Sequence, residues 1–114
     1  MHDTLRDAVE QLARAVEWAV TTYPAQPGIA LAGAVPLLKL FGTVACGWQM
    51  GRAALAAKAA LDQGDNADRD FLTAKIGTAR FYADHVLSQS HGLAHAVMHG
   101  AAGVLALDET QFAA

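Results

Sequence analysis

The chain has 114 residues and a formal net charge of −3; 54% of its residues are hydrophobic and 17% are charged. This length suits one domain with one core, and the composition is too apolar for a disordered segment. The eight lysines and arginines are scattered, which argues against nucleic-acid binding, because such an interface needs grouped cations. We therefore expect a single domain over residues 1–114, and its abundant alanine favours close-packed helices.

Signals for export or membrane insertion are not evident. Met1–Thr4 is not the start of a signal peptide. Cys46 lies in an apolar run and is expected to be a small buried thiol in a cytoplasmic protein. The long apolar stretch 29–48 contains Pro36 and Lys39, and a charge near the bilayer centre costs about 2.5–3.5 kcal/mol. This stretch is therefore predicted to be a buried helix rather than a membrane span.

The first predicted helix covers about residues 3–22, with Asp3 or Thr4 as its cap. Its apolar positions follow helical spacing and predict one buried stripe. The stripe consists of Leu5, Val9, Leu12, Val16, Ala19 and Tyr23. Trp18 falls outside this stripe, which makes it a candidate contact for a partner. The segment 23–28 contains two prolines and a glycine and is predicted to break the helix.

The second predicted helix starts at residue 29 or 35 and ends near residue 61. Pro36 lies either in its first turn or at a kink. Residues 37–48 are apolar nearly all round, which predicts the most buried element of the fold. Gly47 and Gly51 are four residues apart and would let another helix approach closely.

An acidic loop over 61–69 separates the second and third helices. It does not match a calcium loop, because Gly64 falls on a ligand position and no glutamate closes it. Asp68 or Asp70 is predicted to cap a third helix over residues 70–99, which Gly100 would end. The segment 108–112 is expected to form a last turn with Asp108 as its cap.

The third helix is expected to contact neighbours on more than one flank. Its main stripe consists of Leu72, Ile76, Ala79, Ala83 and Val86, and a second set consists of Phe71, Thr78 and Tyr82. Arg80 is expected either to pair with Asp84 or to reach a neighbouring domain. Together the elements predict an all-α fold: an antiparallel bundle of three long helices with a short C-terminal turn.

Three histidines at spacings of four, His91, His95 and His99, are the main chemical pattern in the chain. Histidines at i and i+4 can bind zinc, so His91 and His95 are weak metal candidates. No cysteine joins them, and Asp84 lies too far along the helix, so a solvent-facing ridge is the expected arrangement. Ser88 lies near His91, but nothing there resembles an oxyanion hole. We predict no catalytic or cofactor-binding residue in this chain.

Several segments resemble the C-terminal extension of a subgroup of acyl-CoA dehydrogenases. The residues that carry the resemblance are 71–76, 78–87, 106–109 and 111–112, with weaker support from 38–42, 47–48 and 53–56. Two departures stand out. Ser88 replaces an expected proline, so the outer half of the third helix should be straighter than usual, and the histidines replace mostly small residues.

The resemblance implies an all-helical appendix that serves packing, oligomerisation or the shaping of a substrate channel. In that family FAD and the catalytic glutamate belong to a preceding core, which is absent here. The alternative is a stand-alone homodimeric interaction module without enzymatic activity. An upstream reading frame that continues into a flavoenzyme core would favour the first hypothesis, and a ribosome-binding site at Met1 the second. Both predict an exposed surface for a partner, with Trp18, Arg80, Phe81 and Phe112 as candidates.

Overall fold

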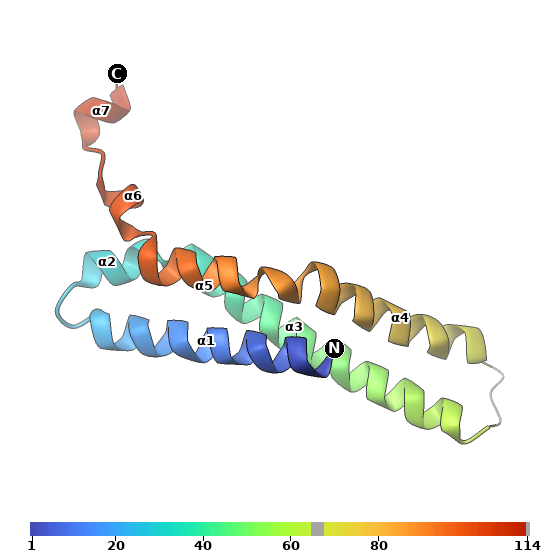
Figure 1. Ribbon diagram of the computed structural model, residues 1–114. Coiled ribbons are helices and arrows are strands. Elements are labelled where there is room, and N and C mark those ends of the chain that lie inside the picture. The colour runs from blue at the N-terminus through green and yellow to red at the C-terminus, as the bar shows by residue number, and fades with distance from the viewer. Residues whose placement is uncertain (65–67, 114) are drawn as a thin grey trace.

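The structure is a computed structural model that describes residues 1–64 and 68–113. The chain forms a long, narrow bundle of 66 × 32 × 15 Å (Figure 1). Helix α1 (His2–Thr22) runs in one direction, α3 (Ala34–Asp62) returns, and α4 (Arg69–His85) with α5 (Ser90–His99) runs antiparallel to α3. The described residues form helices, turns and no strand, so the predicted all-α class is confirmed.

The connection between α1 and α3 contains a short helix, α2 (Pro27–Ala32). Pro27 occupies a first-turn position of α2, where a missing amide hydrogen costs nothing. Pro36 likewise lies in the first turn of α3, so the break that we expected over 23–28 is shorter than predicted. Gly33 separates the two helices and lies against α5: an added Cβ would stand 2.8 Å from the carbonyl oxygen of Val97.

Helix α1 is rotated relative to the stripe predicted from its sequence. Its buried residues are Ala8, Gln11 and Ala15, whereas Val9 and Val16 are 46% and 39% exposed. Small alanines let α3 and α5 approach the α1 backbone closely, and this favours the observed orientation. The helix begins at His2, with Met1 at the N-cap and no side-chain cap. The predicted cap at Asp3 or Thr4 is therefore wrong.

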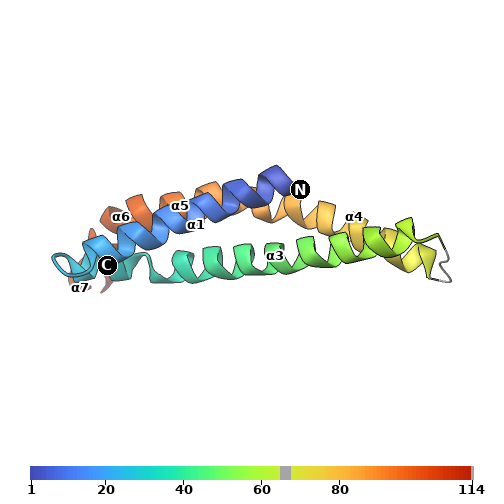
Figure 2. The same ribbon diagram turned by 90° about the horizontal axis from the view of Figure 1, so that it is seen from below.

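Helix α3 is covered on one side only, which corrects the prediction of a fully buried central element. Leu40, Val44, Gly47 and Ala57 are buried, and further apolar positions of the same helix are exposed. The reason is visible in Figure 2, where α3 forms one layer and α1 lies with α5 in the other. Cys46 is also exposed, so the expectation of a buried thiol is wrong.

The predicted helix over 70–99 is interrupted. A 3₁₀ turn, η1 (Leu87–Gln89), separates α4 from α5, so the prediction of one continuous helix is wrong. Ser88 Oγ donates to the Asp84 carbonyl and Gln89 Nε2 to the His85 carbonyl, each at 2.8 Å. Such side-chain bonds to preceding carbonyls stabilise an irregular turn inside a helical segment.

The interruption brings Leu87 into the core against α3. Leu87 is completely buried, and a Cβ added to Gly47 would stand 2.7 Å from its Cδ2 atom. Gly51 lies next to Leu5, but with 3.6 Å between an added Cβ and Leu5 Cδ2 the contact there is an ordinary one. The predicted close approach is therefore confirmed at Gly47 and not at Gly51.

The α3–α4 hairpin extends beyond the N-terminus of α1 (Figure 1). Phe71 and Thr78 are exposed on α4 while Tyr82 is half-buried, so the expected second packed flank of this helix is wrong. Asp68 occupies the N-cap of α4 without a side-chain cap bond. Residues 65–67 of the predicted acidic loop lie outside the described part of the chain.

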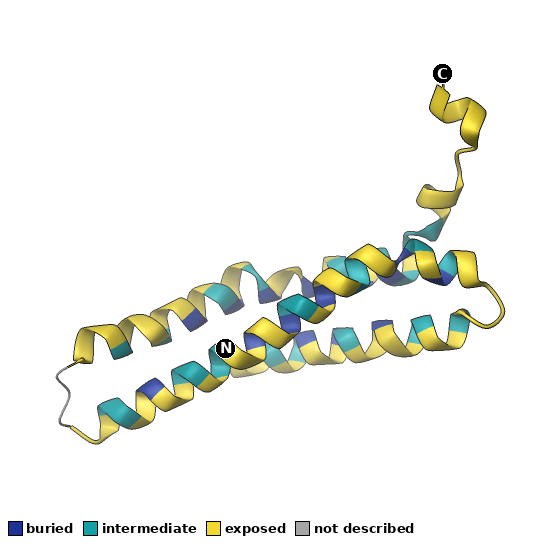
Figure 3. Cartoon of the chain, turned by 180° about the vertical axis from the view of Figure 1, so that it is seen from behind, coloured by how far each residue is buried: buried dark blue, intermediate teal, exposed yellow. Residues whose placement is uncertain are grey.

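The C-terminal segment leaves the bundle as two short helices, α6 (Ala101–Leu105) and α7 (Glu109–Ala113), neither with a buried residue. Figure 3 shows them exposed, while the buried positions gather where the long helices face one another. Gly100 ends α5 as expected. The predicted Asp108 cap is confirmed, because Asp108 Oδ1 accepts the Gln111 backbone N–H at 3.0 Å and the Thr110 hydroxyl at 2.6 Å.

The hydrophobic core follows the middle of the bundle, where all three long segments overlap. Alanine supplies half of its members, which fits closely spaced helices rather than a core of bulky side chains. The buried cluster consists of Ala8, Ala15, Leu40, Val44, Ala83, Leu87, Ala94 and Val97.

Candidate interaction surfaces

The hydroxyls of Tyr82 and Ser88 bond backbone carbonyls, and neither forms a nucleophile–base pair with a histidine. Ser88 bonds the Asp84 carbonyl and not the ring of His91. The Tyr82 hydroxyl donates to the Thr43 carbonyl of α3 at 2.7 Å. Burial, with a smaller contribution from Cys46, raises the pKa of Tyr82. A neutral, hydrogen-bonded phenol here joins α4 to α3.

The three histidines are exposed along α5, as the sequence predicts. His91 Nε2 pairs with the carboxylate of Asp7 on α1, and the rings of His95 and His99 lie 5.1 Å apart. Within residues 1–64 and 68–113, no three or more histidine, cysteine, aspartate or glutamate side chains gather as metal ligands do. The weak metal candidates His91 and His95 therefore lack, in this region, the four-ligand set of a structural zinc site.

The four predicted contact residues lie in different environments. Trp18 is half-buried and packs against the core cluster. Phe81 is 61% exposed and stacks on His85, with 4.4 Å between the ring centroids. Arg80 is exposed, and the ion pair that we expected between Arg80 and Asp84 is not formed. Phe112 is 73% exposed on α7.

An exposed apolar surface that joins α1 to α3 was not predicted. We define the α1–α3 face by its nine large apolar side chains, which are between 39% and 72% exposed. They are Val9, Val16 and Val20 of α1, Tyr23 at its C-cap, Leu31 of α2, and Leu38, Phe41, Trp48 and Leu55 of α3. The sequence signal was present in α3, where apolar residues occupy two sides of the helix.

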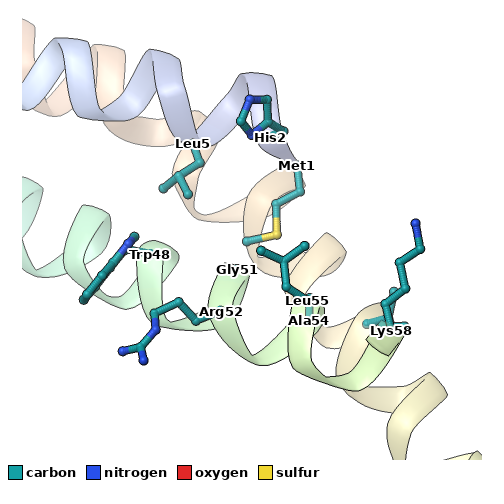
Figure 4. Close-up of a pocket in the computed structure, with 10 residues that line it drawn as sticks. Met1, His2, Leu5, Trp48, Gly51, Arg52, Ala54, Leu55 and Lys58 are labelled. Carbon is teal, nitrogen blue, oxygen red and sulfur yellow. The ribbon is translucent and has the colours of Figure 1, made fainter. Parts of the chain in front are cut away.

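Two hollows show that the two rows of side chains belong to one face. One hollow, of about 290 Å³, lies between the start of α1 and the middle of α3, with Leu5 opposite Trp48 and Leu55 (Figure 4). The other, of about 390 Å³, lies at the opposite end of the face, with Val20 and Tyr23 near Leu31. Monomeric proteins seldom expose large apolar patches, so the α1–α3 face is a candidate interaction surface.

Charge on the α1–α3 face is sparse and positive at one end. The Arg52 guanidinium lies over the Trp48 ring, 5.0 Å from its centroid. Lys58 and His2 complete the rim of the hollow near the start of α1 (Figure 4). A surface with an apolar centre and few charges is typical of a protein interface.

A bilayer span needs both length and hydropathy in one helix, and no helix among the described residues combines them.

Comparison with known proteins places the chain in a family. The family described as "Acetyl-CoA dehydrogenase C-terminal like" matches residues 1–108. The chain is also similar to 3-methylmercaptopropionyl-CoA dehydrogenase of Ruegeria pomeroyi, with 43% identity over 83 residues. This match covers 73% of the chain but 14% of the relative. No solved structure matches the chain. The family match extends over nearly the whole sequence, and the chain belongs to the C-terminal domains of acyl-CoA dehydrogenases.

Proposed function

We propose that this chain is the non-catalytic, helical C-terminal domain of a flavin-dependent acyl-CoA dehydrogenase. The observation that carries this proposal is the family match over residues 1–108, together with a relative of which the chain spans only 14%. FAD, the oxidoreductase chemistry and the role in fatty acid metabolism then belong to the dehydrogenase core. The chain contributes packing, oligomerisation or the shaping of a substrate channel.

The outer side of α4 and the C-terminal segment supply the contact with the dehydrogenase core in this proposal. Phe81 and Phe112 are more than half exposed, and the exposed Arg80 side chain can pair with a carboxylate of the core. Trp18 offers only the part of its ring that the bundle leaves uncovered. Aromatic and arginine side chains of this kind dominate the energy of many protein interfaces.

A graft experiment tests the proposal. The segment of the Ruegeria dehydrogenase that matches this chain is deleted, or replaced by this chain. We expect the deletion to lower expression, flavin content or thioester oxidation, and the graft to restore them. The 114-residue chain alone should neither bind flavin nor oxidise an acyl-CoA.

Variants of the graft locate the contact. Phe81→Asp and Phe112→Asp should lower the flavin content of the graft, whereas Thr73→Asp, an exposed α4 position, serves as the matched control. A graft that behaves like the deletion, or flavin-dependent oxidation by the chain alone, would contradict the proposal.

The second candidate function is a stand-alone homodimeric interaction module, which the α1–α3 face favours. An upstream reading frame that encodes a flavoenzyme core would decide against it. A cytoplasmic location belongs to either proposal and rests on the lone Cys46, which cannot form a disulfide within the chain. Cell fractionation tests this location.

A further inference from the structure

The α1–α3 face needs a long, nearly straight apolar partner. Along α3 alone, from Leu38 to Leu55, it covers 17 residue steps, or about 26 Å of one helix axis. Its side chains on α3 include Leu38, Phe41, Trp48 and Leu55, which are 72%, 58%, 53% and 71% exposed. Exposure on this scale along one line fits a helix from another molecule better than a small ligand.

The spacing of residues on α3 indicates that a second copy of the same helix covers the α1–α3 face. Positions 38, 41, 45, 48, 52 and 55 alternate steps of three and four, which is the spacing by which helices pair in coiled coils. A two-fold axis near residues 46–47 places this row against the same row of a second copy, with side chains of complementary size opposite one another. Ala45 then faces Trp48 of the second copy, and Leu38 faces Leu55 of the second copy.

The antiparallel arrangement also places the one charged side chain of this row, Arg52, against aromatic surface. Arg52 faces Phe41 of the second copy, so its guanidinium, which already lies over Trp48, stays on aromatic surface. No acidic side chain lies between Leu38 and Leu55 on α3, so no carboxylate is buried without a partner. Self-complementarity of this kind is what a two-fold interface requires.

The available area is sufficient for a stable dimer. Aromatic side chains bury about 150–250 Å² each, so three aromatic and six smaller aliphatic side chains that are roughly half exposed offer on the order of 800 Å² per copy. A standard interface buries about 800 Å² on each partner. The α1 side chains, among them Val9 and Val16, widen the contact beyond α3 alone.

We propose that the α1–α3 face is the interface between two copies of this chain, with the two α3 helices antiparallel and crossing near residues 46–47. The pairing leaves the outer side of α4 and the C-terminal segment free, so one molecule can bind a second copy and a dehydrogenase core at once. The pairing of two copies does not require a dehydrogenase core. A negative result in the dimer test therefore leaves the graft experiment unaffected, and the reverse also holds.

Sedimentation of the 114-residue chain over a range of concentrations tests the proposal. We expect a monomer–dimer equilibrium, and Leu38→Glu should raise the dissociation constant at least about tenfold, because two carboxylates enter an apolar contact. Phe71→Glu is the matched control, since Phe71 is 60% exposed on α4, and should leave the constant unchanged. Circular dichroism confirms that both variants stay helical. A strict monomer at high concentration, or a dimer that Leu38→Glu does not weaken, overturns the proposal.

Cross-linking tests the register in a Cys46→Ser background. The double variant Leu38→Cys, Leu55→Cys should form a covalent dimer on mild oxidation. Neither single variant should do so, because equal positions lie far apart in an antiparallel pair. A covalent dimer of either single variant, or none of the double variant, overturns the antiparallel arrangement.

Discussion

The two sides of helix α3 use the same kinds of residue for different purposes. The covered side consists of Leu40, Val44 and Gly47, packed against α1, α5 and the buried Leu87. The open side carries Leu38 and larger aromatic residues, which water reaches. Leu40 is thus completely buried, whereas Leu38, two positions earlier, is 72% exposed. Composition alone therefore does not say which side of an apolar helix belongs to the core.

The difference lies in what a close helix contact needs. The covered side is lined with alanine and glycine from every participating helix, so that backbones approach and bury small side chains completely. The open side has bulky side chains with nothing opposite them. Such an excess of apolar surface is costly in water and is retained in proteins that use it for binding.

The largest expected effect comes from breaking the covered side at Leu40. Leu40→Ala should lower the free energy of unfolding by about 2–5 kcal/mol, because a completely buried leucine leaves a cavity. Leu38→Ala, at low protein concentration, should change it by less than about 0.5 kcal/mol. Urea unfolding of both variants measures the contrast. Equal losses would show that the two sides of α3 are not distinct in solution.

Gly33→Ala tests how closely α5 approaches the start of α3. The new methyl group would stand 2.8 Å from the Val97 carbonyl oxygen, which belongs to backbone and cannot rotate away. We expect a loss of about 1–3 kcal/mol in the free energy of unfolding. Gly28→Ala, where an added Cβ meets nothing within 4 Å, is the matched control. A neutral Gly33→Ala would place α5 further from α3 than the structure does.

The sequence predicted the helical class, the approximate ends of α1 and α3, the close contact at Gly47 and the Asp108 cap. Each depends on local signals: periodicity, proline and glycine positions, or a capping side chain. The predicted orientation of α1 was wrong because helical periodicity identifies the apolar side of a helix. It does not show which part of that side packs against a neighbouring helix. Val9 lies within the predicted stripe, and Ala8 is the residue that is buried.

The break between α4 and α5 and the α1–α3 face depend on tertiary contacts, which periodicity does not reveal. Ser88 and Gln89 bond carbonyls of the preceding turn, and the adjacent Leu87 lies in the core beside Gly47. Of the predicted contact residues, Phe81 and Phe112 are exposed as surplus apolar residues should be, while Trp18 lies partly in the core. The contacts proposed for them depend on the graft experiment.

Tyr82→Phe tests the polar link on the covered side. Loss of the hydroxyl leaves the Thr43 carbonyl without its 2.7 Å hydrogen bond from α4, and we expect a loss of about 1 kcal/mol. Because burial raises the pKa of Tyr82 in the folded state, its contribution is complete below the unfolded pKa of about 10 and is lost as pH rises through the higher folded value. The difference in stability between wild type and Tyr82→Phe should therefore shrink at alkaline pH. A difference in stability between wild type and Tyr82→Phe that grows above pH 10 would show that folding lowers the pKa of Tyr82 rather than raising it.

The smallest expected effect concerns the contact between the Asp7 carboxylate and His91, a salt bridge when the imidazole is protonated, which links α1 to α5 at the edge of the covered side. Both side chains are about half exposed, at 45% and 60%, so water and salt weaken their attraction. Asp7→Ala should cost less than about 1 kcal/mol, and added salt should reduce that cost further. Glu10→Ala, an exposed α1 position without an ion pair in the described structure, is the control. If Asp7→Ala destabilised the chain as strongly as Leu40→Ala, the α1–α5 contact would depend on charge rather than on the alanine-lined core.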